Sequence, residues 1–191
     1  MRKMNNKGVL TVISGFSGAG KGTIMKALLK TYDRYALSIS ATTRKPRVGE
    51  EHGREYFFIS RDEFESMIAE DRLLEYARYV DNYYGTPKAE VDRRIAQGRT
   101  VVLVIEVEGA ENIRRLYPEA TTVFLLPPSM EELEARLRGR GTETEEVIAG
   151  RMARAKEEIK QAPLYTTTLV NDEVDVCAEK LYQIIKERQQ G

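Results

Sequence analysis

VLTVISGFSGAGKGT, residues 9–23, is the stretch that decides the fold. Its start, VLTVIS, is mostly apolar and β-branched and predicts a short buried strand. Next comes the pattern G-x-x-x-x-G-K, from Gly15 to Lys21, where a helix is predicted to begin. Between a strand and a helix this pattern indicates a phosphate-binding loop, because glycines let backbone N–H groups converge on phosphate oxygens and the helix N-terminus adds partial positive charge. The competing interpretation is a glycine turn with a solvated lysine.

Gly22 departs from the usual loop, in which Ser or Thr follows the lysine and helps to hold Mg²⁺. The phosphate cradle itself uses backbone groups, so it tolerates this change. We expect the metal to be held by Thr23, one position further on, or through water molecules.

Strand-like and helix-like segments alternate through most of the chain, which predicts an α/β fold with a parallel sheet. The nearly continuous β-branched run at 100–107 predicts a central parallel strand. Residues 40–85 break the alternation with clustered strands and one helix, and indicate an insertion with its own small sheet. The other predicted strands are 36–40, 56–60, 121–128 and 167–172, and 41–56 is predicted to be loop. The predicted helices are 21–32, 86–98, 111–118, 142–162 and the C-terminus. Two further helices are predicted to begin at the capping boxes SRDE (60–63) and SMEE (129–132).

Composition narrows the class of protein. Lys plus Arg and Asp plus Glu number 30 each in the 191 residues, whereas a general nucleic-acid binder usually has a basic excess. No apolar run approaches a membrane span, and the N-terminal MRKMNNK lacks the apolar segment of a secretory signal. The single Cys177 cannot form an internal disulfide, and its helical spacing predicts a buried core thiol. We therefore expect a cytoplasmic protein that binds neither nucleic acid nor membrane.

A second anion site is indicated by Arg44 and Arg47, which stand three positions apart in ATTRKPRVGE (41–50). Planar guanidinium groups suit bidentate contacts with phosphate. Glu75 and Tyr84, in LLEYARYVDNYYGT, are candidates to line a slot for a base. A carboxylate accepts two hydrogen bonds side by side, which matches the adjacent N–H donors on the Watson–Crick edge of guanine. Each residue alone also fits a surface charge or a core tyrosine. The guanine-reading motif N-K-x-D of GTPases is absent.

Taken together, these stretches resemble guanylate kinase along nearly the whole chain. The resemblance rests on GFSGAGKGT (15–23), SISATTRKPRVGEEHGREYFF (38–58), LLEYARYVDNYYGT (73–86), RLRGRGTETEE (136–146) and LVND (169–172). It implies a P-loop kinase core with a parallel sheet flanked by helices, an inserted small α+β GMP-binding domain and a lid. The implied bounds are 1–38 and 90–191 for the core, with the lid at about 128–150, and 39–89 for the insertion.

The resemblance also implies transfer of the γ-phosphoryl group of ATP to GMP, giving ADP and GDP, with dGMP as a further acceptor and Mg²⁺ accompanying ATP. Lys21 would hold the β and γ phosphates, and Glu75 would accept from guanine N1–H and the 2-amino group. The implied ATP-binding residues are Gly15, Phe16, Ser17, Gly18, Ala19, Gly20, Lys21, Gly22, Thr23 and Asn171, the last near the adenine. The implied GMP-binding residues are Ser40, Arg44, Arg47, Tyr56, Glu75, Tyr84, Thr86 and Glu106. The implied catalytic residues are Lys21, Arg44, Arg136, Arg140 and Arg151.

Glu106 stands where the family usually carries Asp, so its part in the GMP and metal network competes with a structural role at a strand end. Two other functions compete with GMP phosphorylation. An inactive guanylate-kinase-like module that binds proteins typically has a damaged loop, which is not the case here. An AMP-specific kinase is disfavoured because Glu75 offers only acceptors and adenine N1 is itself an acceptor. Nothing in the sequence indicates the oligomeric state.

Overall fold

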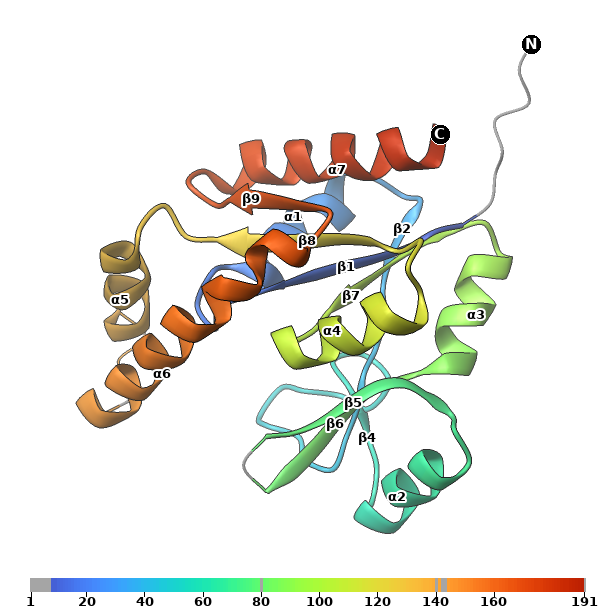
Figure 1. Cartoon of the computed structure of the whole chain (residues 1–191). Helices are drawn as coiled ribbons and strands as arrows, with labels where there is room; N and C mark the ends of the chain where they lie inside the picture. The colour runs from blue at the N-terminus through green and yellow to red at the C-terminus, as the bar shows by residue number, and fades with distance from the viewer. Residues whose placement is uncertain (1–7, 80, 140, 142–143, 191) are drawn as a thin grey trace.

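The computed structural model describes residues 8–79, 81–139, 141 and 144–190. The described chain contains a five-stranded parallel sheet with the order β2-β7-β1-β8-β9 (Figure 1). β1, which leads into the glycine loop, is the central strand, and the segment predicted to be central, β7, lies beside it. The bounds are β1 Leu10–Gly15, β2 Tyr35–Leu37, β7 Thr100–Val104, β8 Thr121–Leu126 and β9 Thr167–Val170.

Helices cover both faces of this sheet, as an α/β fold requires. Figure 1 shows α1 (Lys21–Thr31) beside α7 (Val174–Gln190) over one face, and α3 (Lys88–Ala96) and α4 (Val107–Leu116) over the other. The strands between them are buried on both sides, which explains their continuous apolar runs. Val12, Val101, Val102, Val123 and Phe124 have no exposed surface.

A second sheet comes from the segment that interrupts the alternation. The described residues form four strands in the order β4-β3-β6-β5, with β5 and β6 as an antiparallel hairpin. These strands are β3 Ala41–Thr42, β4 Phe57–Phe58, β5 Leu73–Tyr79 and β6 Asn82–Pro87, and α2 is Arg61–Ala69. The sheet and α2 share a small hydrophobic cluster around Ala41, Phe64 and Leu73, separate from the main core. Figure 1 shows this unit below the larger sheet; the chain enters it between β2 and β3 and leaves it from β6 into α3.

Two helices flank the loop end of the main sheet. They are α5 (Met130–Arg138) and α6 (Glu145–Glu158), and a 3₁₀ helix, Ile159–Leu164, follows α6. Within the segment 142–162, predicted to be helix, the α-helix therefore ends at Glu158. Pro163, in the 3₁₀ helix that follows, cannot donate the backbone hydrogen bond that an α-helix needs. Both capping boxes are confirmed: the Oγ atoms of Ser60 and Ser129 accept from the N–H groups of Glu63 and Glu132 at 3.1 Å.

Several boundaries differ from the predictions. The strand predicted at 36–40 is Tyr35–Leu37, and the predicted loop 41–56 begins with β3. The strand predicted at 100–107 ends at Val104, where its register with β1 also ends. The helix predicted to begin at Glu111 begins at Val107, because Val107 and Ala110 already bury a helical face. Glu106 is thus the N-cap of α4 and not a strand residue.

Cys177 is buried, as predicted, and has a raised pKa of about 11 because burial disfavours the thiolate. Within the described residues, no helix has the length and apolar character needed to cross a membrane.

Candidate active site

The glycine loop joins β1 to α1 and has the conformation that its sequence predicts. Gly15 and Gly20 have φ angles of 135° and 95°, in the left-handed region that side chains disfavour. Space adds a second constraint, since a Cβ on Gly15 would lie 2.2 Å from the carbonyl oxygen of Leu125. The Gly20 residue precedes α1 without any side-chain cap, so the first N–H groups of the helix remain available for an anion.

Lys21 lies at the helix start with its side chain largely buried. Its ammonium group donates to the carbonyl oxygens of Gly15 and Phe16 at 2.6 and 3.2 Å, and lies 3.9 Å from the carboxylate of Glu106. The Lys21 side chain therefore folds back onto the glycine loop and places its positive charge beside the loop backbone. Glu106, at the start of α4, brings a carboxylate to the same place.

Asn171 lies under the loop. It is 3% exposed, and its Nδ2 donates to the carbonyl oxygen of Ala19 at 2.8 Å. A Cβ on Gly20 would lie 2.2 Å from the same nitrogen, so the loop packs directly on the amide. The Arg136 guanidinium donates to the Asn171 carbonyl oxygen at 3.1 Å and pairs with Glu132. The geometry gives Asn171 the role of fixing the loop shape.

Arg151 reaches the loop from α6. Its guanidinium donates to Ser17 Oγ at 2.7 Å, a contact between residues far apart in the sequence. The predicted lid residue Arg140 lies outside the described residues.

A cavity of about 390 Å³ opens between the glycine loop and the smaller sheet. It brings together eight of the predicted site residues, from both sheets and from α6. It does not include Lys21, Arg44, Thr86, Arg136 or Asn171 in its lining. The cavity is lined by Ser17, Ser40, Arg47, Tyr56, Glu75, Ala77, Tyr84, Gly85, Val104, Ile105, Glu106, Gly109, Arg151, Arg154 and Glu158.

Glu75 is the most deeply buried charge in this lining, at 7% exposure. Its Oε1 accepts a 2.6 Å hydrogen bond from the Thr86 hydroxyl, which places Thr86 behind the carboxylate. Burial raises the pKa of Glu75 to about 7; the Thr86 bond opposes that rise, and the charge of Glu108 adds to it. Gly109 leaves room for the other oxygen, because a Cβ there would lie 2.5 Å from Oε2. A buried carboxylate with so few donors suits a ligand that brings N–H groups.

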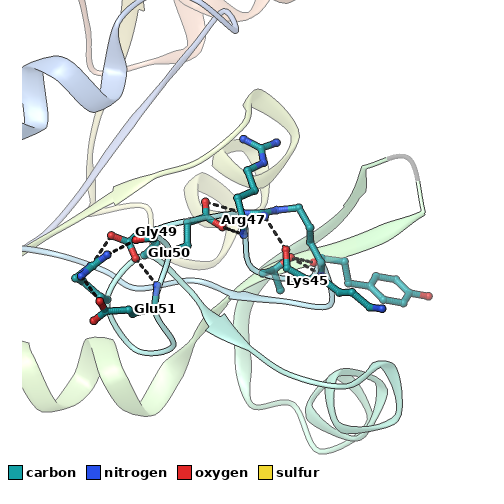
Figure 2. Close-up of polar contacts among 10 residues, drawn as sticks. Lys45, Arg47, Gly49, Glu50 and Glu51 are labelled. Atoms are coloured by element: carbon teal, nitrogen blue, oxygen red, sulfur yellow. Dashed lines mark hydrogen bonds and ion pairs between the residues drawn. The ribbon is translucent and has the colours of Figure 1, made fainter. Parts of the chain in front are cut away.

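The two arginines of the 41–50 loop take different places. Arg47 lines the cavity. Arg44 pairs with Glu50 at 2.9 Å, and its guanidinium carbon lies 5.4 Å from the centre of the Tyr56 ring. Figure 2 shows the Arg47 side chain extending away from the carboxylate that holds Arg44. Arg44 is not part of the cavity lining, but its guanidinium group contacts Tyr56, which is.

Arg154 and Glu158 line the cavity but are not among the predicted site residues. They form an ion pair at 2.6 Å, in which the Glu158 side chain is only 11% exposed. Burial raises the pKa of Glu158, the charge of Arg154 lowers it, and the charge of Glu106 raises it further. The signal available in the sequence was the spacing of Arg151, Arg154 and Glu158, which places all three on one face of a helix.

The residues present fit a magnesium ion that arrives with a nucleotide better than a dedicated metal cage. No group of three or more His, Cys, Asp and Glu side chains suited to a metal occurs in the described ranges. Thr23 is exposed in the first turn of α1, and a Cβ on Gly22 would meet nothing within 4 Å. Mg²⁺ commonly uses one or two carboxylates together with substrate phosphates and water. Glu106 and Glu158 are carboxylates of this cavity that meet that requirement.

Comparison with known proteins places these features in one family. The sequence model of the family described as guanylate kinase matches residues 7–188. The guanylate kinase of Synechocystis sp. is 48% identical over 183 residues, which are 96% of each chain. That of Clostridioides difficile is 51% identical over 94% of this chain and 87% of its own. A crystal structure of guanylate kinase from Anaplasma phagocytophilum, 29% identical, superposes with a TM-score of 0.78 and covers 97% of this chain and 88% of its own. The chain therefore belongs to the guanylate kinase family.

Proposed function

We propose that this chain transfers the γ-phosphoryl group of ATP to GMP, giving ADP and GDP, across the cavity between the two sheets. The observation that carries the proposal is the composition of that cavity. One wall has Ser17 of the phosphate loop, held by Arg151, and another has the buried acceptor Glu75. The proposed triphosphate site and the proposed site for a base with N–H donors would therefore face each other across one space.

ATP is proposed to bind with its phosphates in the loop from Gly15 to Thr23. The N–H groups at the start of α1 and the ammonium of Lys21 supply the positive charge that the phosphates need. Lys21 would exchange its contacts with the loop carbonyls for the β and γ phosphates. Asn171, which donates to the Ala19 carbonyl oxygen of the loop, is proposed to lie near the adenine. Arg136 and Arg140 would complete the site from the lid, about 128–150, in a core made of 1–38 and 90–191.

GMP, and dGMP with it, is proposed to bind to the insertion 39–89. Glu75 in its ionised form would accept from N1–H and the 2-amino group of guanine. The Ser40 and Thr86 hydroxyls are proposed to approach O6. The proposed phosphate-binding residues are Ser40, Arg44, Arg47, Tyr56 and Tyr84. Support comes from the cavity, which has Ser40, Arg47, Tyr56 and Tyr84 in its lining with Glu75.

The phosphoryl transfer mainly requires that the two nucleotides are aligned and that their negative charges are neutralised. The attacking oxygen of GMP is already anionic, so no general base is required. The main obstacle is repulsion between two polyanions, and Lys21, Arg47 and Arg151 would offset it in a site that the two units shield from water. Mg²⁺ bound to ATP would neutralise further phosphate charge, held by Glu106, Thr23 or bridging water. Since ATP and GMP are cytoplasmic metabolites, the cytoplasm is the proposed place of action.

Turnover of GMP, AMP, UMP and CMP with ATP and Mg²⁺ tests the proposal. We expect GMP to be preferred over AMP by on the order of 10⁴-fold in kcat/KM, because adenine would set an acceptor against the Glu75 acceptor. Lys21→Ala should abolish turnover of every substrate. Equal rates with AMP and GMP, or no rate with either, would contradict the proposal. The second outcome, together with binding of another protein to the same cavity, would favour an inactive binding module.

A further inference from the structure

Two glycines pack against Glu75, and a side chain at either one would meet different atoms of that residue. A Cβ added to Gly85, on β6, would lie 2.9 Å from the backbone carbonyl oxygen of Glu75 and 2.9 Å from the ring of Phe64. A Cβ added to Gly109, on α4, would lie 2.5 Å from Oε2 of Glu75 and 3.2 Å from its carboxyl carbon. Neither glycine has a positive φ angle, so space is what a side chain at these positions would change.

Gly109 therefore meets the carboxylate that is proposed to read the base, and not the backbone that carries it. Apart from the backbone of its own helix, the three atoms nearest to the added Cβ all belong to side chains, the third being Cδ1 of Ile105 at 3.4 Å. Glu75 lies on β5 of the smaller sheet, Gly109 lies on α4 beside the larger sheet, and both residues line the cavity. A contact between the two units thus passes through the Glu75 carboxylate.

The first turn of α4 also suits an anion at this position. The helix has no side-chain cap at Glu106, and the Ala110 N–H donates to the Glu106 carbonyl oxygen at 3.0 Å. Gly109 precedes Ala110 and so belongs to the turn whose N–H groups have no acceptor within the helix, where partial positive charge gathers. That charge favours the ionised form of Glu75, although the charge of Glu108 acts the other way. The missing side chain at Gly109 lets the carboxylate approach this turn.

We propose that Gly109 is a specificity-determining residue, because its lack of a side chain leaves the Glu75 carboxylate the position from which it accepts the N–H donors of guanine. This rests on the proposed function. The alternative is that Gly109 serves only the packing of α4 against the smaller unit. A Cβ would then be expected to meet backbone atoms, as it does at Gly85. At Gly109 the obstructed atom is the end of a side chain, which can turn aside, so the variant can fold with Glu75 misplaced.

Gly109→Ala tests this with Gly150→Ala as the matched control. Both glycines lie within helices, so both substitutions favour the helical backbone to a similar extent. Gly150 is exposed on α6, outside the cavity lining, and a Cβ there would meet nothing within 4 Å. We expect Gly109→Ala to weaken guanosine binding on the order of 10- to 10²-fold, as the loss of a hydrogen bond to a charged group predicts, with the KM for ATP unchanged. Gly150→Ala should bind guanosine as the wild type does.

A double-mutant cycle with Glu75→Ala shows whether the effect passes through the carboxylate. Glu75→Ala removes the group that the added Cβ would displace, so Gly109→Ala should cost no further guanosine affinity in that background. Melting temperatures separate recognition from packing. Gly85→Ala should lower the melting temperature by about 5 °C, because its Cβ would overpack against backbone, whereas Gly109→Ala should not lower it.

Three results would overturn the inference. They are unchanged guanosine binding by Gly109→Ala, an equal loss of affinity in the Glu75→Ala background, and a fall in melting temperature like that of Gly85→Ala. Failure of the wild type to phosphorylate GMP would instead overturn the proposed function.

Discussion

Glu75 shows how one side chain combines a cost in stability with a role in recognition. It is buried and accepts one described hydrogen bond, from Thr86. Burial raises its pKa to about 7, close to the pH at which the protein would work. A protonated carboxyl group offers one O–H donor, which conflicts with the N–H donors of guanine. The proposed recognition of guanine therefore requires the ionised form of Glu75, which burial disfavours.

Guanosine binding should depend on this ionisation. We expect the wild-type affinity for guanosine to rise as the pH increases from 6 to 8, through the Glu75 pKa of about 7. Guanosine is the right ligand because it lacks the phosphate of GMP, which also titrates near pH 6. Glu75→Gln should bind guanosine on the order of 10- to 10²-fold more weakly at pH 8, with no dependence over this range. A pH-independent wild type would contradict the assignment.

Stability should show the opposite trend with pH. The folded-state pKa of Glu75 lies above the unfolded value near 4.5, so the folded protein binds the proton more tightly between pH 4.5 and about 7. The Glu75 contribution therefore falls as the pH rises through this window, by about 3 kcal/mol in all. Glu75→Gln removes this fall. In denaturant titrations its free energy of unfolding, relative to the wild type, should increase from pH 4.5 to pH 7 and then level off.

At the scale of elements, helix α6 connects the two halves of the site. Arg151 reaches Ser17 in the loop, and Arg154 and Glu158 extend along the same helical face into the cavity. The helix is capped by Thr144, whose Oγ accepts from Val147 N–H at 3.5 Å. Any movement of α6 would carry all three charges together, because a helix moves as a rigid unit.

Arg154→Gln should lower kcat for GMP on the order of 10- to 10²-fold. Loss of a single arginine finger lowers the rate by about 10³- to 10⁵-fold. A smaller loss is expected here, since Arg151 would still reach the proposed phosphate site through Ser17. Arg93→Gln is the matched control: Arg93 is an arginine in an exposed helical ion pair with Glu90, on α3 and outside the cavity lining. Steady-state rates with ATP and GMP, and melting temperatures of both variants, provide the measurement. A normal rate for Arg154→Gln would make the Arg154–Glu158 pair purely structural.

At the scale of the whole molecule, the site belongs to neither sheet alone. The larger sheet positions the glycine loop and Glu106, and the smaller one positions Glu75 and Tyr84. The smaller unit has its own hydrophobic cluster of three buried residues, Ala41, Phe64 and Leu73, which is a small core for a separate unit. A ligand that contacts both units would couple their stabilities.

GMP should therefore stabilise the whole chain in one transition. At 100 times its dissociation constant, GMP should add about 2.7 kcal/mol to the free energy of unfolding. For a chain of this size that corresponds to a rise in melting temperature of about 5–10 °C. Scanning calorimetry with GMP, and with AMP as the control, measures the effect. Two separate transitions, with only one shifted by GMP, would show that the units unfold independently.

The sequence by itself determined the features that depend on neighbouring residues. Gly15 and Gly20 specify left-handed backbone between a strand and a helix, and Ser60 and Ser129 specify helix starts, because a hydroxyl reaches the N–H three residues ahead. The alternation of apolar runs specified the parallel sheet. Glu75, Arg47 and Tyr84 were found from their residue types and from the family resemblance, and the cavity contains all three.

Only the tertiary structure decided which distant groups meet. It placed Asn171 under Ala19, across 152 positions of sequence, and it put Glu106 at the start of α4. It set Arg44 against the ring of Tyr56 and brought Arg154 and Glu158 into the cavity. The physical reason is that local pattern fixes backbone conformation and the face of an element. The partner that a long charged side chain finds depends instead on how the helices and the two sheets pack, and on which carboxylates they bury nearby.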